Sequence, residues 1–469
     1  MLQQPRAQEL IAFGAGGALA GVLLIELAYQ ISPFAPLVAA GGLGIAWLAV
    51  TRPIAAVYAA IVLVPLEVIP LPLGKVATLS PTEAAFIIAG LGWAVRRLLS
   101  GRLPYVRTPL GLPLILLIVA AIASYSSAPL ALPVTKTVFM WSMLLLVYWL
   151  LADEGTPGSV RGILVALGIA GAVVGMIALV GSSGVQQELS NAGETARGRA
   201  IGSFTQPNIL AAFLALSLPG ALVLAIYGRG WVRPAMAAAL VPICTGLALS
   251  LSRGGLLAAA GAFAVLVSWR PFRRLLIAFV AAFIVLALVN ANPLGSVQQV
   301  NTVTERVESV QYAPRLDPRI DIWTTTPRIV QDHPVFGVGA ASFGEVAPTY
   351  GLTDPTTTEP FDHAHNAPLT IAAELGLVGL AGLVWLLVRL TQVVVRALRR
   401  THDAERALAV AVTAALVGLA LQGAVDYTQR SNVLAAVMIC LFGSAFILSR
   451  AGEPPAQPPP GTPISSPPT

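Results

Sequence analysis

Long apolar runs recur from one end of this chain to the other and constrain its fold more than any other feature. An α-helix rises about 1.5 Å per residue, so about 20 apolar residues cross the roughly 30 Å hydrocarbon core of a bilayer. The chain of 469 residues is 56% hydrophobic and only 11% charged. A soluble domain carries roughly 25% charged residues. Because backbone polar groups in lipid must be satisfied within each span, and because the runs do not alternate as barrel strands do, the sequence predicts an all-α, polytopic integral membrane protein.

We expect about 12 to 14 transmembrane helices from the lengths of these runs. The candidate spans are residues 9–29, 33–50, 54–72, 82–99, 109–126, 133–151, 160–180, 205–227, 232–250, 254–269, 272–290, 367–390, 406–425 and 431–449. No internal repeat is evident, which disfavours a transporter built from duplicated halves.

The positive charges predict the orientation of the chain. With the N-terminus in the cytoplasm, most arginines, including the pairs Arg96-Arg97 and Arg399-Arg400, fall on the cytoplasmic side. This asymmetry follows the positive-inside rule and predicts that both termini lie in the cytoplasm. It also accounts for the net charge of +6, so no nucleic-acid partner is expected.

The chain divides into four segments. Residues 1–290 form N-terminal transmembrane helices, and residues 291–366 form one large extracytoplasmic loop. Helical spacing in RLDPRIDIWTTTPRIVQDHP predicts that this loop is partly helical and caps the membrane domain. Residues 367–450 form C-terminal transmembrane helices, and residues 451–469 form a Pro-rich tail, which we expect to be disordered and cytoplasmic.

The predicted topology gathers polar residues on the outer face. Those with substrate-binding chemistry are Arg197, Arg199, Asn208, Arg253, Arg315 and Arg319. Guanidinium is a planar, permanently charged fork that matches phosphate oxygens, so the set suits a lipid-linked phosphate or pyrophosphate. The alternative is structural: the arginines contact lipid head groups or pair with nearby acids.

The stretch FDHAHNAPLTIAAELGLVG, residues 361–379, places two histidines directly before a span. Asn366 is a good N-cap and Pro368 fits the first turn, so His365 precedes the positive end of a helix dipole. That field disfavours imidazolium and leaves a neutral base for a hydroxyl nucleophile, unless the histidine only satisfies loop hydrogen bonds. The spacing of His363 and His365 also permits a metal site, but no third ligand is evident, so neither a metal nor a cofactor is expected.

Two acidic residues have structural interpretations. Glu374 lies within the span, too deep to touch His365; an intramembrane carboxylate is functional by default, but it can also pair with an arginine to fix helix packing. Asp426 and Arg430 occupy the last outer turn and are expected to form a structural pair. Asn366, His363 and Glu374 are therefore assigned supporting roles.

Several of these stretches resemble the bacterial O-antigen ligase family, which is related to O-antigen polymerases and to some protein O-oligosaccharyltransferases. His365-Asn366, nine residues, glycine, two residues, glycine is similar to that family's H-[N/S/Q]-x9-G-x-x-G pattern. The stretches RGRAIGSFTQPNILAAF, SRGG and RIDIW also match in order. The resemblance covers roughly residues 195–445.

The resemblance implies a GT-C-like membrane glycosyltransferase. It would transfer a glycan from an undecaprenyl-pyrophosphate carrier to a hydroxyl acceptor outside the inner membrane, inverting the anomeric centre without a metal. The acceptor would be lipid A–core in ligases, another glycan in polymerases, or Ser or Thr in protein transferases. His365 would be catalytic. Arg199 and Arg319 would contact the pyrophosphate, with Arg197 and Arg315 as alternative equivalents.

Which acceptor and which sugar the protein uses stay open at this point, as do its oligomeric state and the role of His363. A polysaccharide transporter or flippase is the non-enzyme alternative. It would place ionisable residues along a mid-membrane pathway, whereas the polar residues here collect on one face.

Overall fold

The computed structural model describes residues 35–73, 77–181, 199–269, 272–273, 318–353 and 360–452. Nearly all of their regular structure is helical, which confirms the all-α class. The strands in these ranges are β1 (Leu71–Leu73) and β2 (Ala77–Leu79), a short antiparallel hairpin in which Leu71 pairs with Leu79.

The helices follow one another with short connections over most of the described chain. In order they are α2 (Ala35–Thr51), α3 (Pro53–Val62), η1 (Val64–Leu66), α4 (Pro81–Leu99), α5 (Gly111–Ala123), η2 (Ser124–Ser126), α6 (Ala131–Glu154), α7 (Pro157–Gly181), α8 (Pro207–Tyr227), α9 (Val232–Leu249), α10 (Arg253–Ser268), α13 (Pro318–Asp332), α14 (Phe343–Val346), η5 (Ala347–Tyr350), α15 (Ala367–Arg400), α16 (Asp403–Gly423), η6 (Thr428–Arg430) and α17 (Asn432–Ser449).

Seven of these helices are long and apolar enough to cross a membrane: α6, α7, α8, α9, α15, α16 and α17. Shorter apolar helices lie in α2, α3, α5 and α10. The polytopic membrane class is therefore confirmed. The number of 12 to 14 spans stays a prediction, because candidate span 9–29 and nearly all of 272–290 lie outside the described residues.

Local sequence signals explain where several helices begin. Pro53, Pro81 and Pro207 lie in the first turns of α3, α4 and α8, where a missing N–H costs no intrahelical bond. Ser80 and Glu83 form a capping box at the start of α4, each satisfying a backbone N–H of the other.

The prediction of a span over residues 54–72 is wrong in its second half. Helix α3 ends at Val62, and the chain continues through η1 into the β1–β2 hairpin. Pro65, Pro70 and Pro72 lack the backbone N–H that a continuing helix would need, so the apolar run turns away from helical geometry.

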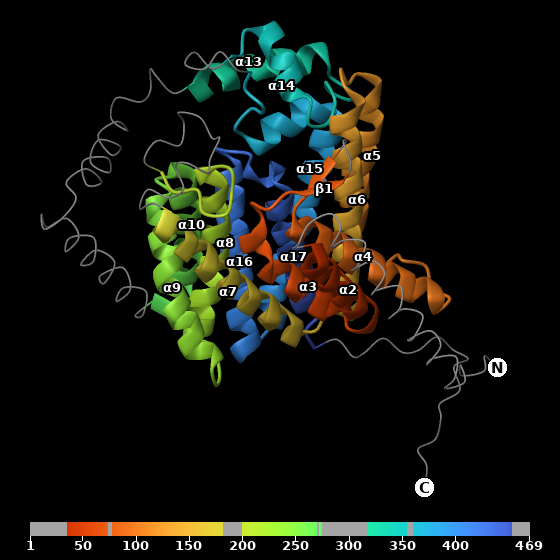
Figure 1. Cartoon of the computed structure of the whole chain (residues 1–469). Helices are drawn as coiled ribbons and strands as arrows, with labels where there is room; N and C mark the ends of the chain where they lie inside the picture. The colour runs from red at the N-terminus through yellow and green to blue at the C-terminus, as the bar shows by residue number, and fades with distance from the viewer. Residues whose placement is uncertain are drawn as a thin grey trace, which may run out of the picture.

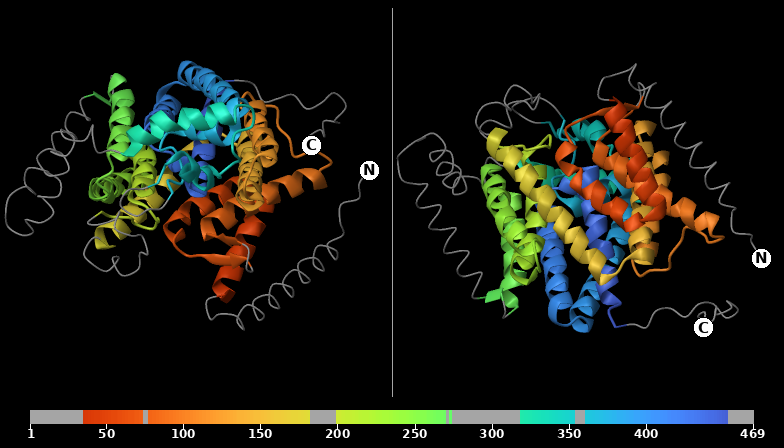
Figure 2. Two further views of the ribbon diagram at one scale, coloured as in Figure 1. Left: turned by 90° about the horizontal axis from the view of Figure 1, so that it is seen from above. Right: turned by 60° about the horizontal axis from the view of Figure 1, so that its bottom comes forward.

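Helix α8 is the centre of one half of the bundle, and its side chains are buried along almost the whole helix. It packs against α7, α9, α10 and α16. In the other half, α17 packs against α6, α15 and α16, and α5 lies along α6 and α15. Figures 1 and 2 show these two groups side by side, joined through α16 and α17.

Helix α15 is interrupted near its outer end. Gly376 has φ 66° and ψ −164°, which no helical residue adopts. The freed backbone groups bond to the segment before α14: Leu377 N–H donates to the Pro334 carbonyl at 2.8 Å, and Gly339 N–H donates to the Glu374 carbonyl at 3.0 Å. The break is stable because the outer segment supplies the partners that an interrupted membrane helix loses.

The segment from α13 through η5, residues 318–350, forms an outer cap over this end of the bundle. Figure 1 shows α13 and α14 at the top, above α15. Its own small core is formed by buried apolar side chains such as Ile322, Ile329 and Phe343. The prediction that the RIDIW stretch is helical is confirmed, since α13 spans Pro318–Asp332. Residues 291–317 of the predicted outer loop and 453–469 of the predicted tail lie outside the described residues.

Candidate active site

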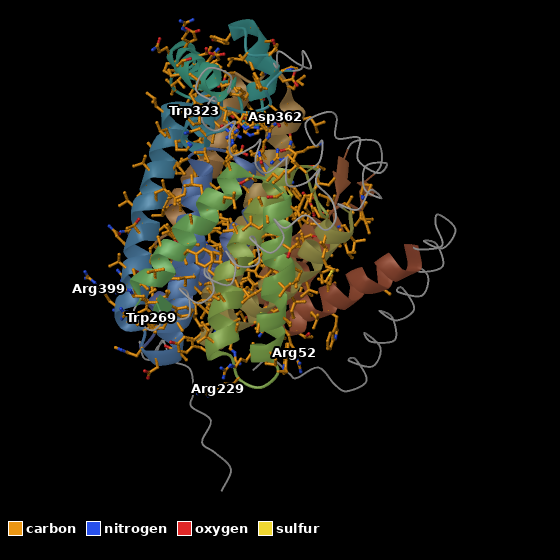
Figure 3. All side chains as sticks on the ribbon, turned by 90° about the vertical axis from the view of Figure 1, so that its left-hand side faces the viewer. Arg52, Arg229, Trp269, Trp323, Asp362 and Arg399 are labelled. Carbon is orange, nitrogen blue, oxygen red and sulfur yellow. The ribbon has the colours of Figure 1, made fainter. Side chains whose placement is uncertain are left out.

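Polar side chains from distant parts of the chain meet at the capped end of the bundle. Figure 3 shows Trp323 and Asp362 at this end, while Arg52, Arg229 and Arg399 lie at the opposite end. This capped end is the outer end of the bundle. The segments that meet there are residues 199–208, 250–253 and 360–366, the α16–α17 connection and, above them, α13.

The start of α15 fixes the position of His365. Asn366 is the N-cap, as predicted: its side-chain oxygen accepts from Leu369 N–H at 2.9 Å, and its amide donates to the Ala424 carbonyl at 2.9 Å. His365 has φ 46°, a left-handed conformation that is uncommon for a residue with a side chain and costs roughly 1–3 kcal/mol. Such strain persists only where the surroundings hold the residue in place.

Asp426, in the α16–α17 connection, orients His365. Its Oδ1 lies 2.9 Å from His365 Nδ1 and also accepts Tyr427 N–H at 3.0 Å. Because a carboxylate only accepts, His365 donates from Nδ1, so the neutral form of the ring carries its lone pair at Nε2. No described residue bonds His365 Nε2, and the side chain is 23% exposed. This histidine can therefore accept a proton from outside the protein.

The other oxygen of Asp426 connects this histidine to the α8 and α10 termini. Asn208 donates from Nδ2 to Asp426 Oδ2 at 2.7 Å. Asn208 Oδ1 in turn accepts from Arg199 Nη2 at 2.9 Å and from the Ser252 hydroxyl at 3.0 Å. Arg199 also donates from Nε to the Ser250 carbonyl at 2.9 Å. Two of the predicted substrate-binding residues, Arg199 and Asn208, thus belong to one network with the predicted catalytic histidine.

His363 lies between two carboxylates. Its Nδ1 is 2.6 Å from Asp362 Oδ1, and its Nε2 is 3.2 Å from Asp426 Oδ1. Burial opposes the charged ring, but the hydrogen bonds to the two carboxylates outweigh burial and raise the pKa of His363 to about 9. Burial likewise opposes ionisation of Asp426, but hydrogen bonds from the two histidines hold the pKa of Asp426 well below its usual range.

Arg430 completes the network on the exposed side. It donates to the Asp362 backbone carbonyl and lies 3.4 Å from Asp362 Oδ2. The expected Asp426–Arg430 pair is therefore wrong: Arg430 pairs with Asp362, and Asp426 is bound by the histidines and Asn208. The local sequence could not show that Arg430 pairs with Asp362, because the two residues are 68 positions apart in the chain.

The remaining predicted arginines lie around this network or outside the described residues. Arg253 begins α10 directly after Ser252, whose hydroxyl bonds Asn208. Arg319 lies one turn before Trp323, on the same face of α13, and Trp323 Nε1 donates to the Ala364 carbonyl at 2.9 Å. Trp323 thus fastens this face of α13 to the histidine loop. Arg197 and Arg315 lie outside the described residues.

Glu374 is buried and does not touch His365, as expected. Its partners are backbone groups of the outer cap: Ala341 N–H donates to Oε2 at 2.9 Å and Phe343 N–H donates to Oε1 at 3.4 Å. Among the described residues no arginine hydrogen-bonds to Glu374, and Arg430 acts on it only electrostatically. Glu374 fastens the start of α14 to α15, immediately before the Gly376 break.

Asp362 supplies the third side chain of suitable chemistry that was not evident from the spacing of the two histidines. Oxygen and nitrogen atoms of Asp362, His363 and His365 lie within 4.8 Å of one another. Three of the four ring nitrogens of the two histidines already have carboxylate partners. The described arrangement is thus a satisfied hydrogen-bond network, and the expectation of a metal-free site stays a prediction.

Sequence reasoning found the histidine loop and part of the arginine set, but it did not single out Asp362 and gave Asp426 only a structural pairing with Arg430. The available signal for Asp426 was its place: an acidic residue in a short outer turn between two spans, on the face that also carries His365. For Asp362 the signal was its position directly before the HxH stretch. Neither signal indicates which histidine nitrogen each carboxylate contacts.

Comparison with known proteins finds one similarity, in a segment that includes the histidine loop. Residues 238–384 match the family model described as O-antigen ligase. The matched segment contains α10, the described outer cap and the start of α15 with both histidines, whereas Arg199, Asn208 and Asp426 lie outside it. No curated protein matches the chain. In this segment the chain, which has helices long and apolar enough to cross a membrane, is similar to the O-antigen ligase family.

Proposed function

We propose that this protein is a glycosyltransferase that moves a glycan from an undecaprenyl-pyrophosphate carrier to a hydroxyl acceptor such as lipid A–core. One observation carries the proposal. His365 Nδ1 hydrogen-bonds to Oδ1 of the ionised Asp426 at 2.9 Å, while His365 Nε2 has no bond to any described residue. A histidine oriented through one nitrogen by a carboxylate and open at the other is the arrangement of a general base.

In the proposed reaction, the acceptor oxygen attacks the anomeric carbon while His365 Nε2 takes the hydroxyl proton. The bond from that carbon to the phosphate oxygen breaks, and its electron pair leaves with the undecaprenyl pyrophosphate. Attack from the face opposite the leaving group inverts the anomeric centre. Negative charge develops on the pyrophosphate, and fixed guanidinium groups stabilise such charge more in the transition state than in the ground state.

Arg199 and Arg319 are the proposed pyrophosphate contacts among the described residues. Arg253, which follows Ser252 in the chain, is a further candidate. Arg199 already donates to Asn208 and the Ser250 carbonyl, so its fork is held in a fixed orientation. A preorganised cation needs little rearrangement as the leaving group departs. Arg197 and Arg315 stay further candidates for the same role.

The proposed location is the bacterial inner membrane, with the site outside and both termini in the cytoplasm. Support comes from the distribution of charge along the bundle: Arg52, Arg229 and Arg399 lie at the end opposite Asp362 (Figure 3). Cytoplasmic loops carry the excess of basic residues.

The test is direct transfer by purified protein in detergent, supplied with an undecaprenyl-pyrophosphate oligosaccharide and separate candidate acceptors, with and without EDTA. We expect product with the wild type and a loss of about 100-fold or more in His365→Ala, the scale of general-base catalysis. Wild-type activity in His365→Ala would remove the base assignment. The matched control is His402→Ala, which changes a histidine at the start of α16 rather than in the outer site.

The acceptor arms separate the alternatives within the family. Transfer to a second carrier-linked glycan would identify an O-antigen or exopolysaccharide polymerase, and transfer to Ser or Thr would identify a protein O-oligosaccharyltransferase. If no acceptor is modified but proteoliposomes move the lipid-linked glycan across the membrane, a transporter or flippase replaces the glycosyltransferase. Loss of transfer with EDTA would overturn metal independence.

A further inference from the structure

We propose that His363 is a positioning residue that works as a fixed imidazolium, holding Asp426 against the Nδ1 of His365. The inference rests on the proposed function and adds to it, because the family pattern assigns a role to His365 and none to His363. Its starting point is geometric: a buried ring that is 6% exposed faces a different carboxylate at each nitrogen.

The two contacts dictate the protonation of the ring. A neutral imidazole carries one N–H and can donate to only one carboxylate, leaving a lone pair opposed to the other. Asp362 lies 2.6 Å from Nδ1, a distance typical of a charge-assisted bond, and Asp426 lies 3.2 Å from Nε2. Only the doubly protonated ring satisfies both, and the raised pKa of His363 is consistent with it.

This charge matters because His363 and His365 share one acceptor atom. Both rings bond Asp426 Oδ1, and their centroids are 4.2 Å apart. If His363 lost its Nε2 proton, a lone pair would face Oδ1 and push the carboxylate from its place. If it lost its Nδ1 proton, the repulsion would act on Asp362 instead and loosen the loop that carries both histidines.

The charged groups facing His363 come from three elements. Asp362 and His365 belong to its own loop; Asp426, Tyr427 and Arg430 lie in the α16–α17 connection; and Glu374 lies on α15. Arg430 is bound to Asp362, so it fixes the outer carboxylate of the pair rather than competing for His363. The two negative charges nearest the ring are thus those it contacts directly.

The chain has only four histidines, which makes the charge measurable independently of activity. Purified full-length protein with ¹⁵N-labelled histidine would be titrated by NMR in detergent. Signals would be assigned from His→Gln variants at positions 333, 363, 365 and 402. We expect the His363 ring to be doubly protonated at pH 7 and to lose a proton as pH rises through about 9. Asp362→Asn, which removes one carboxylate at a half-exposed position, should move that step to lower pH.

Kinetics on the same preparations test the positioning role. His363→Gln should lower kcat by roughly 10- to 100-fold with little change in KM, the scale on which groups that orient a reactive residue act. In Asp362→Asn, the alkaline limb of the pH profile of kcat should lie at lower pH than in the wild type. His333→Gln, the same substitution in the outer cap, should leave both measurements unchanged. A purely structural role for His363 would lower the folded yield without shifting the pH profile of Asp362→Asn.

The outcomes separate this inference from the function it rests on. A neutral His363 at pH 7 overturns the inference even if the wild type transfers glycan. Transfer by His363→Gln at the wild-type kcat also overturns it, while leaving His365 as base. If the wild type transfers nothing to any acceptor, the proposed function fails, and the positioning role fails with it whatever the NMR reports.

Discussion

The two ends of the helical bundle both carry charged side chains, but they use them differently. At the outer end, Asp426 and His363 are almost fully buried and belong to a network that joins the starts of α8, α10 and α15 to the α16–α17 connection. At the opposite end, Arg96 and Glu154 form a pair at 3.6 Å whose side chains are 41% and 29% exposed. Oppositely charged side chains therefore pair at both ends, but those at the outer end are buried and those at the opposite end are exposed to water.

The difference predicts where a substitution matters. Exposed ion pairs contribute little, because water screens them and ordering two long side chains costs entropy. A buried charge that loses its partner is much more costly, because its desolvation is no longer offset. The outer network should therefore be sensitive to single atoms, and the opposite end should tolerate most changes.

The largest effect is expected at the centre of the outer network. Asp426→Asn keeps the shape but replaces a carboxylate that accepts from two histidines, Asn208 and Tyr427. We expect kcat for glycan transfer to fall by about 100-fold or more, because His365 loses the partner that fixes its tautomer. The control is Asp332→Asn in the outer cap, where the carboxylate accepts one exposed tyrosine hydroxyl. Equal activity of the two variants would contradict the network.

The next effect tests the break in α15. A Cβ on Gly376 would lie 2.2 Å from the Val335 carbonyl oxygen, at a φ of 66° that favours glycine. Gly376→Ala should destabilise the protein by roughly 2–3 kcal/mol or prevent the cap from docking. The measurement is the Tm in detergent. Gly382→Ala is the control on the same helix, because its added carbon would meet only the leucine side chains of Leu117, at 3.2 Å, and Leu116, at 3.5 Å. A Tm change no larger than that of the control would show that the break is not required.

Glu374→Gln tests how α15 holds the outer cap. The amide replaces one of the two oxygens that accept the Ala341 and Phe343 N–H groups, so one donor is left facing another donor. Leaving a buried group unsatisfied costs about 1–3 kcal/mol. We expect a lower Tm and faster proteolysis within residues 334–346, with transfer reduced only as far as the cap is lost. Unchanged protease sensitivity of the cap would disprove this anchoring role.

The smallest effects belong to the opposite end, where two neighbouring arginines give a graded comparison. Arg96→Gln should change stability by less than about 0.5 kcal/mol. Arg97→Gln should cost more, about 1–2 kcal/mol, because Arg97 lies 2.6 Å from Asp153, donates to the Leu103 carbonyl and lies over the Trp93 ring. Neither should alter KM for the donor. Thermal melts and the transfer assay check both; a larger loss in Arg96→Gln would reverse the ranking.

Sequence alone determined the features that depend on composition and on neighbouring residues. Apolar runs of span length predicted the helices, and proline and Ser80 marked where several of them begin. Asn366 was identified as the N-cap of α15, which placed His365 directly before that helix, at its outer end. These signals are local: the geometry of one helix end or the length of one span suffices to read them.

Tertiary structure alone decided which residues act together. His365 meets Asp426, 61 residues away, and Asp426 meets Asn208, 218 residues away. Nothing in either local stretch specifies these contacts; they arise when α8, α15, α16 and α17 pack at one end of the bundle. The same holds for Gly376, whose helix break is possible only because residues 334–339 supply its backbone partners. Hydrogen bonds act over about 3 Å, so their partners are fixed by how helices pack, whereas membrane insertion responds to the hydrophobicity of each segment.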